Sequence, residues 1–154
     1  MELTLIRRLP EWNKDPDKIQ NRQYSCHVVF ELNLIDVPIH TWRLDSGATT
    51  HVSHSLKGFT TRRAARPEEK LYLGTGDMIQ VELVGTFRLI LSSGHVLDLE
   101  ETFYVPSLRR NLISIFKLLP FGYDVIFRDY GCDVNIHGEF VGSALLVDGL
   151  FILI

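Results

Sequence analysis

The chain has only two cysteines, Cys26 and Cys132, in 154 residues. Two thiols are too few for a disulfide scaffold or a four-cysteine zinc site, which predicts a reducing, intracellular compartment. The chain also lacks an apolar run long enough to cross a bilayer, and Met1–Pro10 lacks the apolar segment of a secretory signal peptide. We therefore expect a cytoplasmic protein that has no membrane partner.

A surplus of positive charge is missing too. The 16 Lys and Arg residues against 19 Asp and Glu residues give a formal net charge of −3, which disfavours a dominant nucleic-acid-binding surface. Arg62, Arg63, Arg66 and Lys70 are accompanied by acidic residues, so a solvated loop or short exposed helix is favoured there over a basic binding patch. Hydrophobic residues make up 45% of the chain, which excludes disorder throughout and suits one domain.

The N-terminal part of the chain is poorly patterned. Leu9–Asp17 holds two prolines and several polar residues. This composition predicts an arm or linker over residues 1–23 and a folded domain over residues 24–154.

Short β-strands dominate the pattern of the folded domain, because β-branched and aromatic residues recur in short runs between turn residues. Gly74–Asp77 and Ser92–His95 are the clearest turns. The expected strands are 26–34, 39–44, 71–73, 78–83, 86–91, 96–99, 102–105, 123–127, 132–136 and 145–150. Many short strands at close spacing predict a mainly β fold, a small closed or nearly closed β-barrel.

One helix is expected, over Asn111–Leu119. It would start near Ser107 and end at Pro120, and its apolar residues recur at intervals of three and four. The apolar residues that define this face are Leu112, Ile115, Phe116 and Leu119.

Asp45-Ser46-Gly47 is the segment that points to chemistry. The carboxylate directly follows an apolar strand, the hydroxyl of Ser46 can tie the loop to a neighbouring backbone group, and Gly47 allows tight geometry and close approach of a second chain. Such a loop suits a rigidly placed carboxylate. Because a tripeptide often occurs by chance, a β-turn aspartate that caps a strand end is the alternative, and the surrounding sequence must decide.

The surrounding sequence resembles that of retroviral-type aspartic proteases, whose active-site loop reads hydrophobic–Asp–Ser/Thr–Gly–Ala. Gly74–Ile79 resembles the glycine-rich tip of the family's flap hairpin. Arg110-Asn111-Leu112 resembles the Arg–Asp/Asn motif that opens its single helix. The three motifs occur in the family's order.

A closer resemblance is to the protease region of copia-type retrotransposon polyproteins, and it covers residues 24–154. Four segments carry it: Asp45–His51, Phe103–Ile115, Val141–Ser143 and Gly149–Phe151. Asp77 departs from the pattern, since an acid stands where the flap tip usually has a small residue. The cysteine–histidine zinc knuckle and the integrase and reverse transcriptase sequences of complete polyproteins are missing, so a truncated copy is expected.

The resemblance implies a retropepsin-like β-barrel that hydrolyses peptide bonds of the element's own polyprotein, in the cytoplasm or in a virus-like particle. Asp45, Ser46 and Gly47 would form the catalytic loop, and Ser46 would hydrogen-bond across a two-fold axis. Gly74, Thr75, Gly76 and Asp77 would form the flap over an extended peptide substrate, and Arg110 and Asn111 would support the loop. The family needs no metal and no organic cofactor.

The same resemblance implies a homodimer. The mechanism places a water between two aspartates that share one proton, and this chain has one Asp-Ser-Gly segment. A second copy would therefore supply the second aspartate. The alternative is a non-catalytic, truncated β-barrel remnant that acts as an interaction module or has no function, since the same residues would hold such a barrel together.

The remaining polar and aromatic residues are expected to be structural. His51 and His54 have His-x-x-His spacing, but a third metal ligand from Asp45, Cys26 or Cys132 is not placed by the sequence. Exposed or hydrogen-bonded histidines are favoured, and no metal site is predicted. Trp42 is expected in the barrel core, and both cysteines are expected to be small buried residues.

Overall fold

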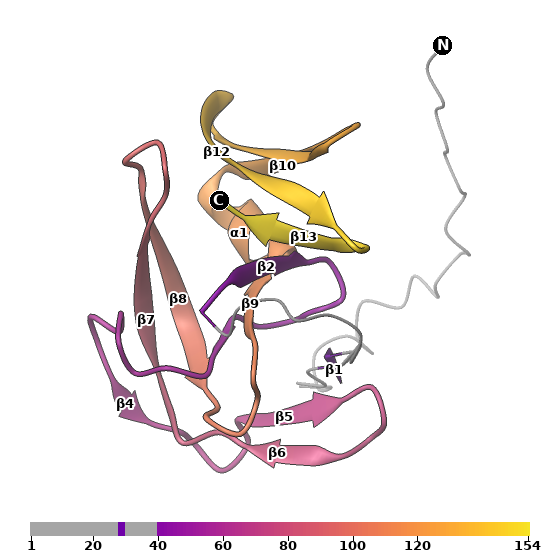
Figure 1. The fold of residues 1–154 in the computed structure, drawn as a ribbon. Coiled ribbons are helices and arrows are strands. Elements are labelled where there is room, and N and C mark those ends of the chain that lie inside the picture. Colours follow the sequence, from indigo (N-terminus) through magenta and orange to yellow (C-terminus); the bar gives the residue numbers. More distant parts are fainter. Residues whose placement is uncertain (1–27, 30–39) are drawn as a thin grey trace, which may run out of the picture.

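The computed structural model describes residues 28–29 and 40–154 (Figure 1). The arm expected over residues 1–23, Cys26 and most of the strand expected over residues 26–34 lie outside the described residues. None of the described helices is long and apolar enough to span a membrane.

The described residues form a mainly β structure with one short α-helix, as predicted (Figure 1). The elements are β1 (Val28–Val29), β2 (Trp42–Asp45), β3 (Val52–Ser53), β4 (Arg63–Ala64), β5 (Lys70–Leu73), β6 (Met78–Gln80), β7 (Leu83–Ile90), β8 (Val96–Tyr104), β9 (Asn111–Ser114), α1 (Ile115–Leu118), the 3-10 helix η2 (Leu119–Phe121), β10 (Tyr123–Arg128), β11 (Gly131–Ile136), β12 (Glu139–Val147) and β13 (Leu150–Leu153).

The described strands pair into two sheets, and neither is closed. A ten-stranded sheet has the order β10-β11-β12-β13-β2-β9-β3-β8-β7-β4, and a three-stranded sheet has the order β1-β5-β6. The expected closed barrel is therefore not formed by the described residues. At one end of the large sheet β4 pairs with only two residues of β7, and at the other end β10 pairs with β11 alone. The number of strands in a sequence does not determine whether the outer strands meet.

Two groups of buried apolar side chains form the core. The larger includes Trp42, which is 7% exposed, and Cys132, which is fully buried, so the predictions for these two residues are confirmed. The ring of Trp42 contacts that of Phe87 with centroids 4.7 Å apart. The smaller group contains side chains from both sheets, such as Leu71 on β5 and Val84 on β7. Each large apolar side chain buried in this way contributes roughly 1.5–3 kcal/mol to folding.

The expected helix over Asn111–Leu119 is wrong in its first half. Asn111–Ser114 is strand β9, which is buried on both faces and runs parallel to β2. Helix α1 follows and is only four residues long. Phe116 is 70% exposed and Leu119 is 50% exposed, so the helical spacing did not mark a buried face.

Two expected strand boundaries are wrong as well. The strand expected over residues 145–150 is interrupted by Asp148 and Gly149, whose φ angles of 49° and 81° form a tight turn between β12 and β13. An Asp-Gly pair with positive φ at both positions matches the right-handed twist of a hairpin. The strand expected over residues 78–83 ends at Gln80, and β7 starts at Leu83.

Candidate functional site

Asp45 is the last residue of β2, and its position is determined by two neighbouring strands. β2 pairs with β13 on one side and with β9 on the other, where Asp45 lies opposite Ser114 in a parallel register. Trp42, Arg43 and Leu44 are buried, Asp45 is half-buried, and Ser46 is exposed. The carboxylate thus emerges at the surface from the end of a buried strand.

The Asp45 side chain is oriented by its own loop. The backbone N–H of Gly47 donates to Asp45 Oδ1 over 2.7 Å. A Cβ atom at position 47 would lie 3.3 Å from the same oxygen, a tight contact. The glycine therefore lets the loop close on the carboxylate. This geometry agrees with a catalytic carboxylate and equally with an aspartate that caps the end of a strand.

Ser114, at the end of β9, ties the Asp45 loop to helix α1. Its hydroxyl donates to the carbonyl of Ala48 over 2.6 Å and accepts from the backbone N–H of Lys117 over 3.3 Å. Ser114 is completely buried, so both bonds are shielded from water. Our sequence interpretation missed this residue. The available signal was a serine directly before a short helix, which is an N-cap pattern.

His51 completes this anchor from the other end of the loop. Its Nδ1 accepts the backbone N–H of Ser114 over 3.1 Å, and its side chain is 2% exposed. Burial, together with the positive charge of Lys117, lowers the pKa of His51 to about 3. The imidazole is therefore neutral at physiological pH, as an Nδ1 acceptor must be.

His54 does not join His51 at a common site. The Nδ1 atom of His54, directly after β3, lies 2.8 Å from Oδ1 of Asn111, whereas His51 contacts the backbone of Ser114. Within residues 28–29 and 40–154, no group of three His, Cys, Asp or Glu side chains could hold a metal ion. The prediction of hydrogen-bonded histidines is confirmed for this pair.

Asn111 supports the strands that lead to the loop. Its Oδ1 accepts from the backbone N–H of His54 over 3.1 Å and from Ser53, and its Nδ2 donates to the carbonyl of Thr41 just before β2. Asn111 is part of β9, not of a helix, and these hydrogen bonds join it to the end of β3 and to the residue before β2. Arg110 is half-buried, and its charge adds to the effect of burial in lowering the pKa of Arg43.

Gly74, Thr75, Gly76 and Asp77 form the tip of the β5–β6 hairpin, as the turn signal predicted. All four residues are exposed. Gly76 has φ +90°, its N–H donates to the carbonyl of Leu73, and Thr75 Oγ1 donates to the Asp77 carboxylate over 2.8 Å. The hairpin belongs to the three-stranded sheet, apart from the sheet that carries Asp45. The hydrogen bonds of its tip stay within the hairpin.

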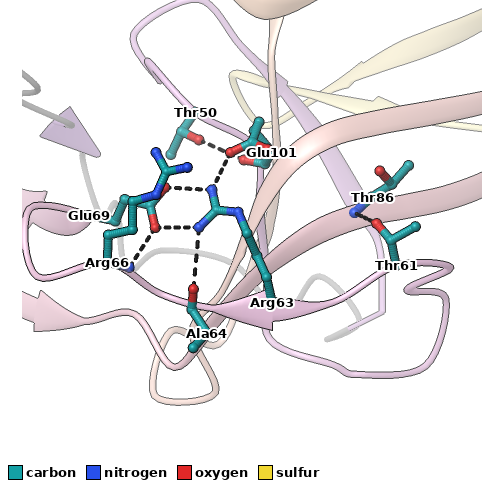
Figure 2. Close-up of polar contacts among 8 residues, drawn as sticks. All are labelled: Thr50, Thr61, Arg63, Ala64, Arg66, Glu69, Thr86 and Glu101. Atoms are coloured by element: carbon teal, nitrogen blue, oxygen red, sulfur yellow. Dashed lines mark hydrogen bonds and ion pairs between the residues drawn. The ribbon is translucent and has the colours of Figure 1, made fainter.

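The segment around residues 60–70 is mostly exposed, as expected of a solvated loop, and Arg63 in it forms an ion-pair cluster (Figure 2). The guanidinium of Arg63, on β4, donates to both carboxylate oxygens of Glu69 and to the carboxylate of Glu101. These hydrogen bonds raise the pKa of Arg63 and, with the Arg66 backbone N–H, lower the pKa of Glu69 to about 2. The role of Arg63 is therefore structural: its guanidinium joins Glu69 to Glu101.

The cluster touches the end of the Asp45 loop through Glu101. This residue has φ 52°, which is uncommon outside glycine, and lies where the β7–β8 register shifts opposite Thr86. The Glu101 carbonyl accepts the hydroxyl of Thr50 over 3.4 Å (Figure 2). Sequence patterns contain no signal for this bulge, because Glu is not a residue that favours positive φ.

Comparison with known proteins gives one family and two relatives. The model of the family "Pol polyprotein, beta-barrel domain" matches residues 42–123, which include the Asp45 loop, the β5–β6 hairpin and Ser114. The retrovirus-related Pol polyprotein from transposon RE2 of Arabidopsis thaliana is 32% identical over 79 residues, and that from transposon RE1 of the same plant is 29% identical over 79 residues. Each match covers 51% of this chain and 5% of the relative's length.

Proposed function

Because the chain belongs to the family of Pol polyprotein beta-barrel domains, we propose that it is the retropepsin-like aspartic endopeptidase of a copia-type retrotransposon polyprotein. The observation that carries the proposal is the setting of Asp45. Its carboxylate stands at the end of a buried strand, accepts the Gly47 N–H, and lies in a loop that Ser114 anchors. A carboxylate that activates water must be held in one orientation in this way.

In the proposed mechanism two chains bring their Asp45 carboxylates together across a two-fold axis. Two carboxylates at such short distance share one proton. The ionised one takes a proton from the bound water, whose oxygen attacks the peptide carbonyl, while the protonated one donates to the carbonyl oxygen. Collapse of the tetrahedral species returns a proton to the leaving amine. The substrate is an extended segment of the polyprotein, and no cofactor takes part.

Activity should depend on protein concentration, because a monomer holds one carboxylate of the pair. Specific activity on a peptide from the parent polyprotein is expected to rise with concentration until the dimer saturates. Ser46→Ala should shift the half-maximal concentration upward, about tenfold for a lost interchain hydrogen bond. Peptide cleavage and sedimentation measured over one concentration series give both curves.

Two outcomes would contradict this scheme. Cleavage by a species that sediments as a monomer would contradict the shared pair. A dimer that cleaves nothing would leave Asp45 as a strand-end cap and the chain as a non-catalytic interaction module.

The hairpin tip should matter for turnover beyond its effect on stability. Gly76 and Gly94 form a matched pair, since both are hairpin glycines with positive φ, +90° and +86°, and a Cβ atom at either meets nothing within 4 Å. Substitution of either by alanine should cost stability by about 1 kcal/mol through backbone strain. Only Gly76→Ala should also lower kcat/KM, because only the β5–β6 hairpin would close on substrate. Equal losses of activity in the two variants would show that Gly76→Ala lowers activity only by destabilising the fold.

A further inference from the structure

A pocket of about 330 Å³ opens between two segments of chain, residues 65–70 and residues 78–81. It lies where the chain passes from one pair of strands to another. Ala64 pairs with Leu83 at one end, and Lys70 pairs with Gln80 at the other. The two segments diverge between these pairings and leave the opening. Asp45 is not among the residues that line it.

The pocket carries a net positive charge, because its acidic side chain is already neutralised. Glu69 lines the pocket, but both of its carboxylate oxygens accept from Arg63 behind it (Figure 2). One of those oxygens also accepts the backbone N–H of Arg66. The other charged side chains of the lining are Arg66 and Lys70. Both are exposed, and within the described part of the chain neither makes an ion pair.

Apolar side chains provide the rest of the lining. Val81 is buried, Ile79 is half-buried, and Met78 is 56% exposed, which is high for a methionine. Pro67 contributes a rigid wall on the other segment. Two cations beside an apolar surface suit a ligand that has a carboxylate next to an apolar group.

We propose that this pocket binds an acidic peptide segment, with one carboxylate between Arg66 and Lys70 and a neighbouring apolar side chain against Ile79 and Val81. A peptide fits better than a nucleic acid, since the base faces and closely spaced phosphates of a nucleic acid would need more cations and fewer apolar contacts. The site is separate from the Asp45 loop, so it does not depend on whether Asp45 cleaves peptide bonds.

The test uses the full chain with Asp45→Asn, so that no peptide is hydrolysed. Its probe is a fluorescein-labelled, amidated peptide of sequence Ala-Leu-Glu-Leu-Ala, with the Gln peptide in place of Glu as the neutral match. Fluorescence anisotropy should show saturable binding of the Glu peptide, and the Gln peptide should bind about tenfold more weakly because it loses a charge-assisted contact. Arg66→Ala and Lys70→Ala should each weaken the Glu peptide by about the same factor.

Arg62→Ala is the matched control. Arg62 is an exposed arginine shortly before that segment, but its guanidinium donates to the carbonyl of Leu56 and it does not line the pocket. This substitution should change the affinity less than about twofold. Amide resonances of residues 65–70 and 78–81 should shift on titration, whereas those of residues 45–48 should not.

Three results would overturn the proposal. The first is no saturable binding of the Glu peptide below about 1 mM, the weakest affinity of interest. The second is equal affinity for the Glu and Gln peptides, or an equal loss in Arg62→Ala. The third is a shift of the residues 45–48 alone, which would place the peptide at the proposed catalytic site and support that function instead.

Discussion

Asp45→Asn should abolish peptide cleavage while the fold is retained. Asparagine keeps the size of the side chain, and its Oδ1 can still accept the Gly47 N–H that lies 2.7 Å from the carboxylate. It cannot ionise, so the pair of carboxylates no longer holds one exchangeable proton. Loss of general acid–base catalysis predicts a fall in kcat of at least about 10²–10⁴-fold. The measurement is cleavage of a polyprotein peptide, with circular dichroism and thermal unfolding as the check on the fold.

A mixing experiment makes this prediction sharper. Wild-type and Asp45→Asn chains in equal amounts should exchange into dimers of which about a quarter carry two aspartates. At constant total protein the activity should therefore fall to about a quarter, below the half expected for independent active sites. Ser114→Ala can be measured in parallel, because it removes the hydroxyl that donates to the Ala48 carbonyl and leaves the Asp45 carboxylate in place. Activity that falls only to one half would show that each chain works alone.

Acidification below neutral pH should destabilise the domain through His51. Its pKa in the folded chain is about 3, below the ordinary value of 6.5, because it is buried and faces Lys117. Between these pH values the unfolded chain binds a proton that the folded chain does not, so the free energy of unfolding decreases as the pH falls. The slope approaches about 1.4 kcal/mol per pH unit, on the order of 5 kcal/mol over the whole window.

Urea unfolding of the wild type and of His51→Gln between pH 7.5 and pH 5 tests this. The variant should be less stable at pH 7.5, because it loses the fitted acceptor for the Ser114 N–H, but its stability should change less with pH. Glu69 does not contribute to the pH dependence of stability between pH 7.5 and pH 5. Its pKa is lowered from 4.5 to about 2, so its stabilisation is lost only at lower pH. Parallel curves for wild type and His51→Gln would contradict the assignment.

The parts of the fold that sequence predicted were those with local causes. The tip at Gly74–Asp77 was predicted because glycines at a turn lie between two short apolar runs. The strand before Asp45 was predicted because Trp42 and Leu44 alternate with a polar residue, and both are buried in the core.

The parts that failed depend on contacts between distant residues. Leu112 and Ile113 are adjacent, and both are buried, because β9 lies between β2 and β3 with both faces covered. A strand of this kind lacks alternation and cannot be told from part of a helix by spacing alone. Whether the outer strands close a barrel is likewise decided by partners far along the chain.

The candidate site divides in the same way. Asp45, Ser46 and Gly47 are contiguous, so a motif reveals them. The residues that hold the loop are not contiguous with it: Ser114 is 66 residues from Ala48, and Glu101 is 51 residues from Thr50. The ion pairs of Arg63 have no signature either, since a base followed by acids is usually a solvated surface.

The place of β2 in the sheet has a consequence for protein synthesis. β2 is flanked by β9 and by β13, and Arg43 pairs with Ile152, about a hundred residues later. Translation at roughly 5–20 residues per second separates these partners by several seconds. The Asp45 loop therefore cannot take its final form while the ribosome is still adding the strands that hold it. If the loop has the peptidase activity proposed above, that activity would begin only after the segment is complete.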